Sequence, residues 1–166
     1  DAYEHKAMGV YAQGTADEYG LDREAMDEFA INSLTKAQAA IKDGLFDGEI
    51  TPVTYSTRKG EVTVDTDEQP GKARLDKIPQ LRAAFKKDGT ITAANSSSIS
   101  DGAAALILMR ESEAKAKGLQ PLARVMGHTT HSQAPSEFTV APIGAMNSLL
   151  GKLDWTKDDV DLWEIN

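Results

Sequence analysis

The segment from Thr92 to Met109 changes from small polar residues to apolar ones. Its first part is rich in serine and asparagine, whose side chains donate and accept hydrogen bonds and leave room for a ligand. An Asp-Gly pair then predicts a turn, and Ala103 to Met109 is an apolar run typical of a fully buried strand. The pattern therefore predicts a ligand-binding loop joined to a core strand, a common arrangement in α/β proteins.

Helical periodicity dominates the first forty residues. The small residues from Ala7 to Tyr19 favour a helix that ends at Gly20. Asp22 predicts the N-cap of a second helix, because its carboxylate can accept a hydrogen bond from a free N–H of the first turn. Apolar residues then recur every three or four positions up to about Lys42, which predicts one apolar stripe. The stripe consists of Met26, Phe29, Ala30, Leu34, Ala37 and Ile41. The Asp-Gly pair that follows is expected to end this helix.

After residue 50, apolar and polar residues alternate, and the helical periodicity ends. Ile50 to Tyr55 predicts a strand that Pro52 places at an edge or a start. Glu61 to Val64 predicts its partner across a turn at residues 58–60. In the second half, expected helices at 111–117 and 142–152 alternate with expected strands at 103–109, 121–130 and 160–166. This order predicts an α/β fold.

Composition narrows the function. The chain has 166 residues, of which 40% are hydrophobic and 27% charged, so it can bury a core as a globular protein does. A net charge of −8 argues against a nucleic acid partner. No apolar run is long enough for a membrane span, and the absence of cysteine fits a cytoplasmic protein and excludes a thiol nucleophile within this chain. Because the first residue is not Met and the last residues form half a strand pattern, we expect an internal piece of a longer protein.

A basic island interrupts this acidic chain. Six cations lie between residues 72 and 87, opposed by a single aspartate; they are Lys72, Arg74, Lys77, Arg82, Lys86 and Lys87. One interpretation is a solvated surface around a short helix. The other is a site for an anionic, phosphate-bearing ligand. Composition favours the first interpretation and leaves the second open.

Other candidate chemistry is weak. His128 and His131 have a spacing that could bind a metal on a helix, but they lie between a predicted strand and a loop with no third ligand nearby. We therefore expect ordinary polar histidines and no metal site. The serines at 96–98 lack the strand–turn–helix frame of a nucleophile elbow. They are expected to be hydrogen-bonding ligand contacts or turn residues.

Several ordered motifs resemble the thiolase family. Residues 90–105, Thr-Ile-Thr-Ala-Ala-Asn-Ser-Ser-Ser-Ile-Ser-Asp-Gly-Ala-Ala-Ala, resemble its signature Thr-x-Thr-Ala-(Gly/Ala)-Asn-(Ala/Ser)-Ser-x-x-x-Asp-Gly-Ala-Ala-Ala. Residues 7–9, 22–30 and 81–85 resemble its His-Met-Gly, Ser-Arg-Glu-x-x-Asp-x-Phe-Ala and Leu-Arg-Pro-Ala-Phe segments. Residues 163–166 resemble the region that starts its Asn-Glu-Ala-Phe motif. The resemblance is strongest to the short-chain acetyl-CoA acetyltransferase branch of the family.

The resemblance implies a fold and a division of the chain. Thiolases have two βαβαβαββ halves, with a long loop domain inserted in the first half over coenzyme A. By this resemblance, residues 1–88 are the loop domain, residues 89–118 close the N-terminal half, and residues 119–166 open the C-terminal half. The fold class is thus expected to be α/β, as a fragment of the thiolase fold.

The resemblance also implies a reaction. Two molecules of acetyl-CoA condense to acetoacetyl-CoA and CoA, or the reverse thiolysis occurs, through an acyl group on a cysteine that lies outside this chain. An asparagine of the family holds a water in an oxyanion hole, and Asn166 matches it. Ser97 and Ala93 match pantetheine contacts, and Phe85 and Met8 match residues of the pantetheine tunnel and acyl pocket. Lys72 is the nearest match to a phosphate-binding residue.

Partners and alternatives follow from the same resemblance. No cofactor beyond the coenzyme A thioester is expected, and the protein is expected to form a homodimer or homotetramer without nucleic acid or membrane partners. The alternative is a non-catalytic thiolase-like protein that binds coenzyme A or lipid. A β-ketoacyl synthase relative fits less well, since those enzymes lack the large loop domain. Ala7 departs from the family histidine and puts a polar contact there in doubt.

Overall fold

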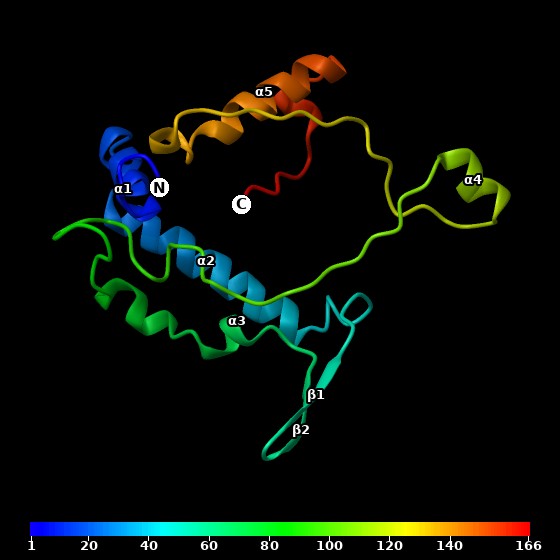
Figure 1. Cartoon of the computed structure of the whole chain (residues 1–166), viewed down its shortest axis with the longest axis horizontal. Coiled ribbons are helices and arrows are strands. Elements are labelled where there is room, and N and C mark those ends of the chain that lie inside the picture. The colour runs from blue at the N-terminus through cyan, green and yellow to red at the C-terminus, as the bar shows by residue number, and fades with distance from the viewer. The chain divides into compact units, whose positions relative to one another are not determined.

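The computed structural model describes all residues from 1 to 166 and divides the chain into two compact units. One unit is Gln13–Ser98, and the other combines Asp1–Ala12 with Ile99–Asn166. Figure 1 shows that the helices α1 and α2 and the hairpin β1–β2 come from the first part of the chain, and α4 and α5 from the second. None of the helices combines the length and the apolar character that a membrane crossing requires.

The two predicted N-terminal helices are confirmed. Helix α1 covers Met8–Glu18 and is followed by Gly20 at a φ of +63°, a left-handed conformation that favours glycine. Helix α2 covers Arg23–Lys42. The Asp22 carboxylate accepts a hydrogen bond from the Ala25 N–H at 2.8 Å, as expected of an N-cap.

The apolar stripe predicted for α2 is confirmed except at Phe29. Ala30 is buried, and four further members are partly buried, namely Met26, Leu34, Ala37 and Ile41. Asp27 of α2 is also buried, whereas Phe29 is 78% exposed. The elements packed on α2 are the short helix α3, Glu68–Lys72, and the 3₁₀ helix η1, Leu75–Gln80. Such short elements cover only a thin strip of a 20-residue helix.

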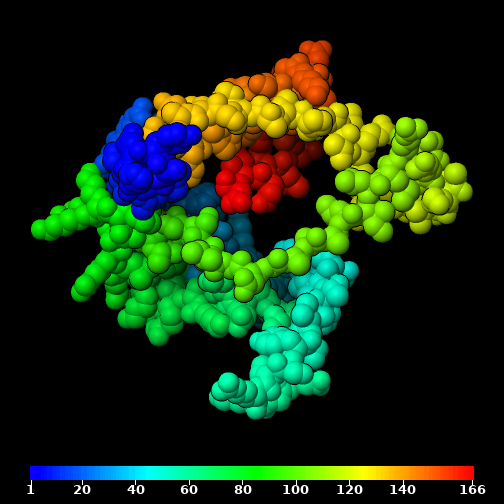
Figure 2. Space-filling view, viewed as in Figure 1, coloured from blue at the N-terminus to red at the C-terminus, as the bar shows by residue number.

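The predicted hairpin forms and stands alone. Strand β1, Val53–Thr57, pairs antiparallel with β2, Gly60–Val64. One face carries the pairs Val53–Val64 and Tyr55–Val62; the other carries Thr54–Thr63, whose hydroxyls lie 2.8 Å apart. The strand begins after Pro52, which has no N–H to give to a ladder. All ten residues are exposed, and the hairpin projects from the rest of its unit (Figure 2).

The second unit contains the helices that the sequence predicts. Helix α4 covers Glu111–Ala116 and α5 covers Ala141–Leu153, with 3₁₀ turns η2 at Pro135–Glu137 and η3 at Lys157–Asp159. Thr129 Oγ1 donates to the Ala145 carbonyl of α5 at 2.8 Å, and Lys152 Nζ donates to the His128 carbonyl at 3.1 Å. The segment around residue 128 is thus fixed to α5.

The three strands predicted in the second half do not form in this chain. Residues 103–109, 121–130 and 160–166 have no ladder partner, since the hairpin is the sheet that the structure contains. The prediction that residues 103–109 are buried is also wrong here, because Leu106 is 85% and Ile107 is 89% exposed. A strand exists only through hydrogen bonds to a neighbour, which its own sequence cannot supply.

Candidate functional site

The loop that carries three predicted site residues begins with a tight turn. The Ala84 N–H donates to the Ile91 carbonyl at 2.8 Å, and the Gly89 N–H donates to the Lys86 carbonyl at 3.0 Å. Between them Asp88 has a φ of +59°, in the left-handed region that Asp tolerates better than most residues. Phe85 therefore lies at the base of a closed turn and is 40% exposed.

Gln13 of α1 fastens this turn. Its side-chain oxygen accepts hydrogen bonds from the N–H groups of Thr90 at 2.9 Å and Ile91 at 3.2 Å. Its amide nitrogen donates to Thr90 Oγ1 at 3.2 Å and to Asp17 Oδ1 at 2.9 Å. Lys86 also donates to Asp17, at 2.6 Å. Both ends of the turn are thus bonded to α1, and the Gln13 amide uses both donors.

The polar run after the turn is ordered by its own side chains. Asn95 Oδ1 accepts from the Thr92 N–H at 2.7 Å, and Asn95 Nδ2 donates to the Thr90 carbonyl at 2.9 Å. Thr92 Oγ1 accepts from the Ala94 N–H at 3.2 Å, and Ser96 Oγ donates to the Thr92 carbonyl at 2.7 Å. Thr92 itself is fully buried. The side chains of Asn95 and Ser96 therefore make their hydrogen bonds within the loop.

The two predicted pantetheine contacts differ from their neighbours. Ala93 and Ser97 are exposed, and neither the Ala93 carbonyl nor the Ser97 hydroxyl has a hydrogen-bond partner within the chain. A rigid loop that offers one free acceptor and one free hydroxyl can bind an amide-bearing ligand. Phe85, on the same loop, can supply apolar contact.

Most of the basic island is paired with carboxylates. Lys72 bonds Glu68 at 2.8 Å, which holds the pKa of that carboxyl below its usual value, and Arg74 bonds Asp76 at 2.9 Å. Arg82 and Lys87 have no carboxylate partner. Because exposed ion pairs contribute little, Lys72 could exchange Glu68 for a phosphate at small cost. Its role as a phosphate contact stays a prediction.

The remaining predicted site residues belong to the other unit. Met8 begins α1 and is 38% exposed, and Asn166 is an exposed residue at the end of the chain. The structure thus brings Phe85, Ala93 and Ser97 together on one loop, with Lys72 elsewhere in the same unit. The assigned roles of Met8 and Asn166 stay predictions.

Of the two histidines considered as metal ligands, His131 packs against a helix. The His131 ring lies against α5 at Gly144, where a Cβ would come within 2.5 Å of it. A group of three His, Asp or Glu side chains that could hold a metal ion does not occur. Gly144 is therefore needed for close approach of the ring.

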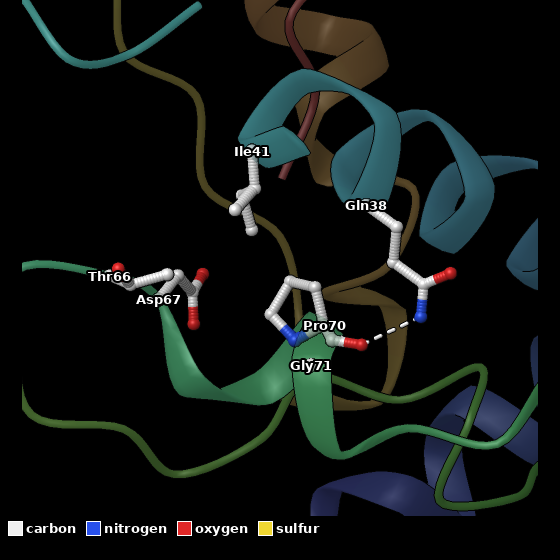
Figure 3. Close-up of a pocket in the computed structure, with 6 residues that line it drawn as sticks. All are labelled: Gln38, Ile41, Thr66, Asp67, Pro70 and Gly71. Carbon is white, nitrogen blue, oxygen red and sulfur yellow. Dashed lines mark hydrogen bonds between the residues drawn. The ribbon is translucent and has the colours of Figure 1, made fainter. Parts of the chain in front are cut away.

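A separate pocket lies between α2 and α3 (Figure 3). It has a volume of ≈ 170 Å³ and is lined by Gln38, Ile41, Thr66, Asp67, Pro70 and Gly71. Its polar groups are already engaged, because Gln38 Nε2 donates to the Pro70 carbonyl at 2.7 Å and Asp67 caps α3. Ligand pockets usually exceed about 300 Å³, so this one is too small for a coenzyme.

The sequence patterns did not indicate the residues that hold the site loop and the segment before it. Gln13 contacts residues 77 and 78 positions away, and no local pattern signals such a contact. Arg23 donates to Asp27 at 2.7 Å and to the carbonyls of Ile78 and Leu81 at 3.0 and 2.9 Å. The Arg-Glu-x-x-Asp sequence that begins at Arg23 could have indicated its pairing with Asp27, since residues four apart share a helix face.

Comparison with known proteins gives consistent matches along the chain. Residues 1–112 match the family model described as "Thiolase, N-terminal domain". A "Probable acetyl-CoA acetyltransferase" from Dictyostelium discoideum is 47% identical over 167 residues, covering 100% of this chain and 40% of that protein. An "Acetyl-CoA acetyltransferase" from Cupriavidus necator is 45% identical, with 100% and 43% covered.

Solved structures match the fold as well. The acetyl-CoA acetyltransferase of Bacillus anthracis superposes with a TM-score of 0.95 at 42% identity, covering 100% of this chain and 42% of that chain. The Acat5 thiolase of Ascaris suum, solved in complex with coenzyme A, gives a TM-score of 0.89 at 38% identity, with the same coverage. The chain therefore spans about two fifths of the length of its relatives.

Proposed function

This chain belongs to the thiolase family, and we propose that its protein transfers an acetyl group between coenzyme A thioesters. The family match covers residues 1–112, and the fold is the thiolase fold, in the part of it that this chain spans. The observation that carries the proposal is 42–47% identity along the whole chain to proteins named acetyl-CoA acetyltransferase.

The proposed reaction joins two acetyl groups. The enolate of one acetyl-CoA attacks the acyl carbon of an acetylated cysteine, so that a C–C bond forms, the C–S bond to cysteine breaks, and acetoacetyl-CoA results. Since this chain has no cysteine, the nucleophile must come from elsewhere in the protein. We assign to Asn166 the role of holding a water that donates to the enolate oxygen.

The site loop would hold the substrate. We assign to Ser97 a hydrogen bond to a pantetheine amide, and to the Ala93 carbonyl a second one. Phe85 and Met8 would supply apolar walls, and Lys72 would face a phosphate. This assignment is supported by the free hydrogen-bonding groups of Ala93 and Ser97 and by the relative that was solved with coenzyme A. No cofactor besides the thioester is required, and we propose a cytoplasmic homodimer or homotetramer.

The test is thiolysis of acetoacetyl-CoA by the intact protein, followed as loss of absorbance of the substrate enolate. We expect turnover, and we expect Ser97→Ala to weaken CoA binding by roughly 1 kcal/mol, the value of one neutral hydrogen bond. Binding of CoA without turnover would instead support a non-catalytic CoA-binding protein. Unchanged affinity in the Ser97 variant would remove that residue from the site.

A further inference from the structure

We propose that Gln13 is a positioning residue, which holds the 90–97 loop in the shape that binds coenzyme A. The inference rests on the proposed function and adds a residue to it. Gln13 does not reach the exposed face of the loop, because it is only 3% exposed. It acts through the backbone of Thr90 and Ile91.

A series of hydrogen bonds links Gln13 to the residues beside the proposed ligand contacts. Gln13 fixes the N–H of Thr90, and the Thr90 carbonyl accepts from Asn95 Nδ2. Asn95 in turn fixes the N–H of Thr92, whose carbonyl accepts from Ser96. Ala93 lies between two bonded residues of this series, and Ser97 follows its last one. A shift at residue 90 therefore displaces both free ligand groups.

The fit around the Gln13 amide is close. A Cβ added at Gly89 would come within 2.5 Å of Gln13 Oε1, so the turn rests directly on the amide. Removal of the amide would leave the Ile91 N–H unsatisfied in a buried position. The turn then has to move in order to reach water, and the loop moves with it.

The first experiment replaces Gln13 by an apolar residue of the same length in the intact protein. Gln13→Met is expected to raise the KM for CoA in thiolysis about five- to tenfold, the effect of one or two lost hydrogen bonds, with kcat within about twofold. Gln38→Met is the matched control. It also loses a part-buried glutamine bond, to the Pro70 carbonyl, but that bond is far in sequence from the loop, so KM should stay unchanged.

A second experiment separates positioning from simple loss of stability. In Gln13→Glu the new carboxylate can still accept from the loop N–H groups, but it faces the Asp17 carboxylate, which in the parent protein accepts from the glutamine amide. We expect a raised KM at neutral pH. Adding Asp17→Asn restores a donor opposite the introduced carboxylate, and KM should return to within about twofold of the parent.

Three results are decisive. The proposal is supported if KM rises in Gln13→Met and returns to near the parent value in the double variant that combines Gln13→Glu with Asp17→Asn. The comparison of Gln13→Glu with this double variant applies even where Gln13→Met does not fold. An unchanged KM in Gln13→Met, or an equal rise in Gln38→Met, overturns it. Absence of thiolysis and of CoA binding in the parent protein refutes the proposed function instead. In that case, unchanged hydrogen exchange of the Thr90 and Ile91 amides in Gln13→Met would refute the positioning role on its own.

Discussion

The two units of the chain differ in how far they satisfy their own hydrogen bonds and apolar surface. In Gln13–Ser98 the helices α2 and α3 carry side-chain N-caps, the strands are paired, and the loop is bonded to a helix residue 77 positions earlier. In Ile99–Asn166 the helices form, but the apolar runs between them are unpaired and exposed. Helices complete their backbone bonds within one segment, whereas strands need a neighbour.

This contrast shows where the chain depends on the rest of its protein. Relatives that match it are more than twice as long, since it covers 40% of one and 42% of another. We therefore expect the exposed runs of the second unit to pair and become buried in the intact protein. The Gln13–Ser98 unit is expected to keep its internal bonds unchanged.

A charge in the apolar run at residues 103–109 should reduce the stability of the intact protein more than any other change considered. Ile107 is 89% exposed in this chain, so Ile107→Glu should change the stability of the 166-residue chain little. In the intact protein we expect a loss of about 4 kcal/mol or failure to fold, because a carboxylate would be buried without a partner. Urea unfolding of both forms measures this. Equal small losses in both would show that the run stays exposed, and the two units would then not differ in this respect.

The second effect concerns the clamp that joins α2 to η1. Arg23→Met removes the hydrogen bonds of Arg23 to Asp27 and to the carbonyls of Ile78 and Leu81. It also leaves Asp27, whose side chain is 7% exposed, without its cation. We expect a loss of roughly 3 kcal/mol in the free energy of unfolding, as for other broken buried pairs. Lys72→Met is the control, since its pair with Glu68 is exposed to solvent and should contribute little to stability. Similar losses in the two variants would contradict the clamp.

The third effect tests a single cap. Asp22→Ala removes the acceptor for the Ala25 N–H, and we expect a loss of about 1 kcal/mol. Asp22→Asn should recover most of it, because asparagine caps a helix as well as aspartate does. Thermal unfolding of the intact protein compares the two variants. A full loss in Asp22→Asn would mean that the charge, and not the hydrogen bond, stabilises this end of α2.

Sequence reasoning succeeded where the determinants are local. Three predicted features that each act within a few residues are found in the structure. They are the cap at Asp22, the glycine after α1 and the turn before Gly60. Sequence reasoning failed for Phe29, whose exposure depends on how little of α2 the neighbouring elements cover. It also could not find Gln13, because the pairing of a glutamine with residues 90 and 91 leaves no periodic signal. The ligand roles of Ser97 and Ala93 came from the family resemblance and stay predictions.

The smallest effect is a titration within the better satisfied unit. The hydrogen bond from Lys86, and then that from Gln13, holds the pKa of Asp17 below its usual value. A lowered folded-state pKa stabilises the fold above the usual aspartate value of about 3.9, and this contribution is lost as pH falls through the folded pKa. Lys86→Met should therefore raise the pKa of Asp17 toward its usual value, measured by NMR of the carboxyl carbon. Because both side chains are about half exposed, global stability should barely change. An unmoved Asp17 titration would show that the bond between α1 and the loop turn does not persist in solution, and the contrast between the units would weaken at that point.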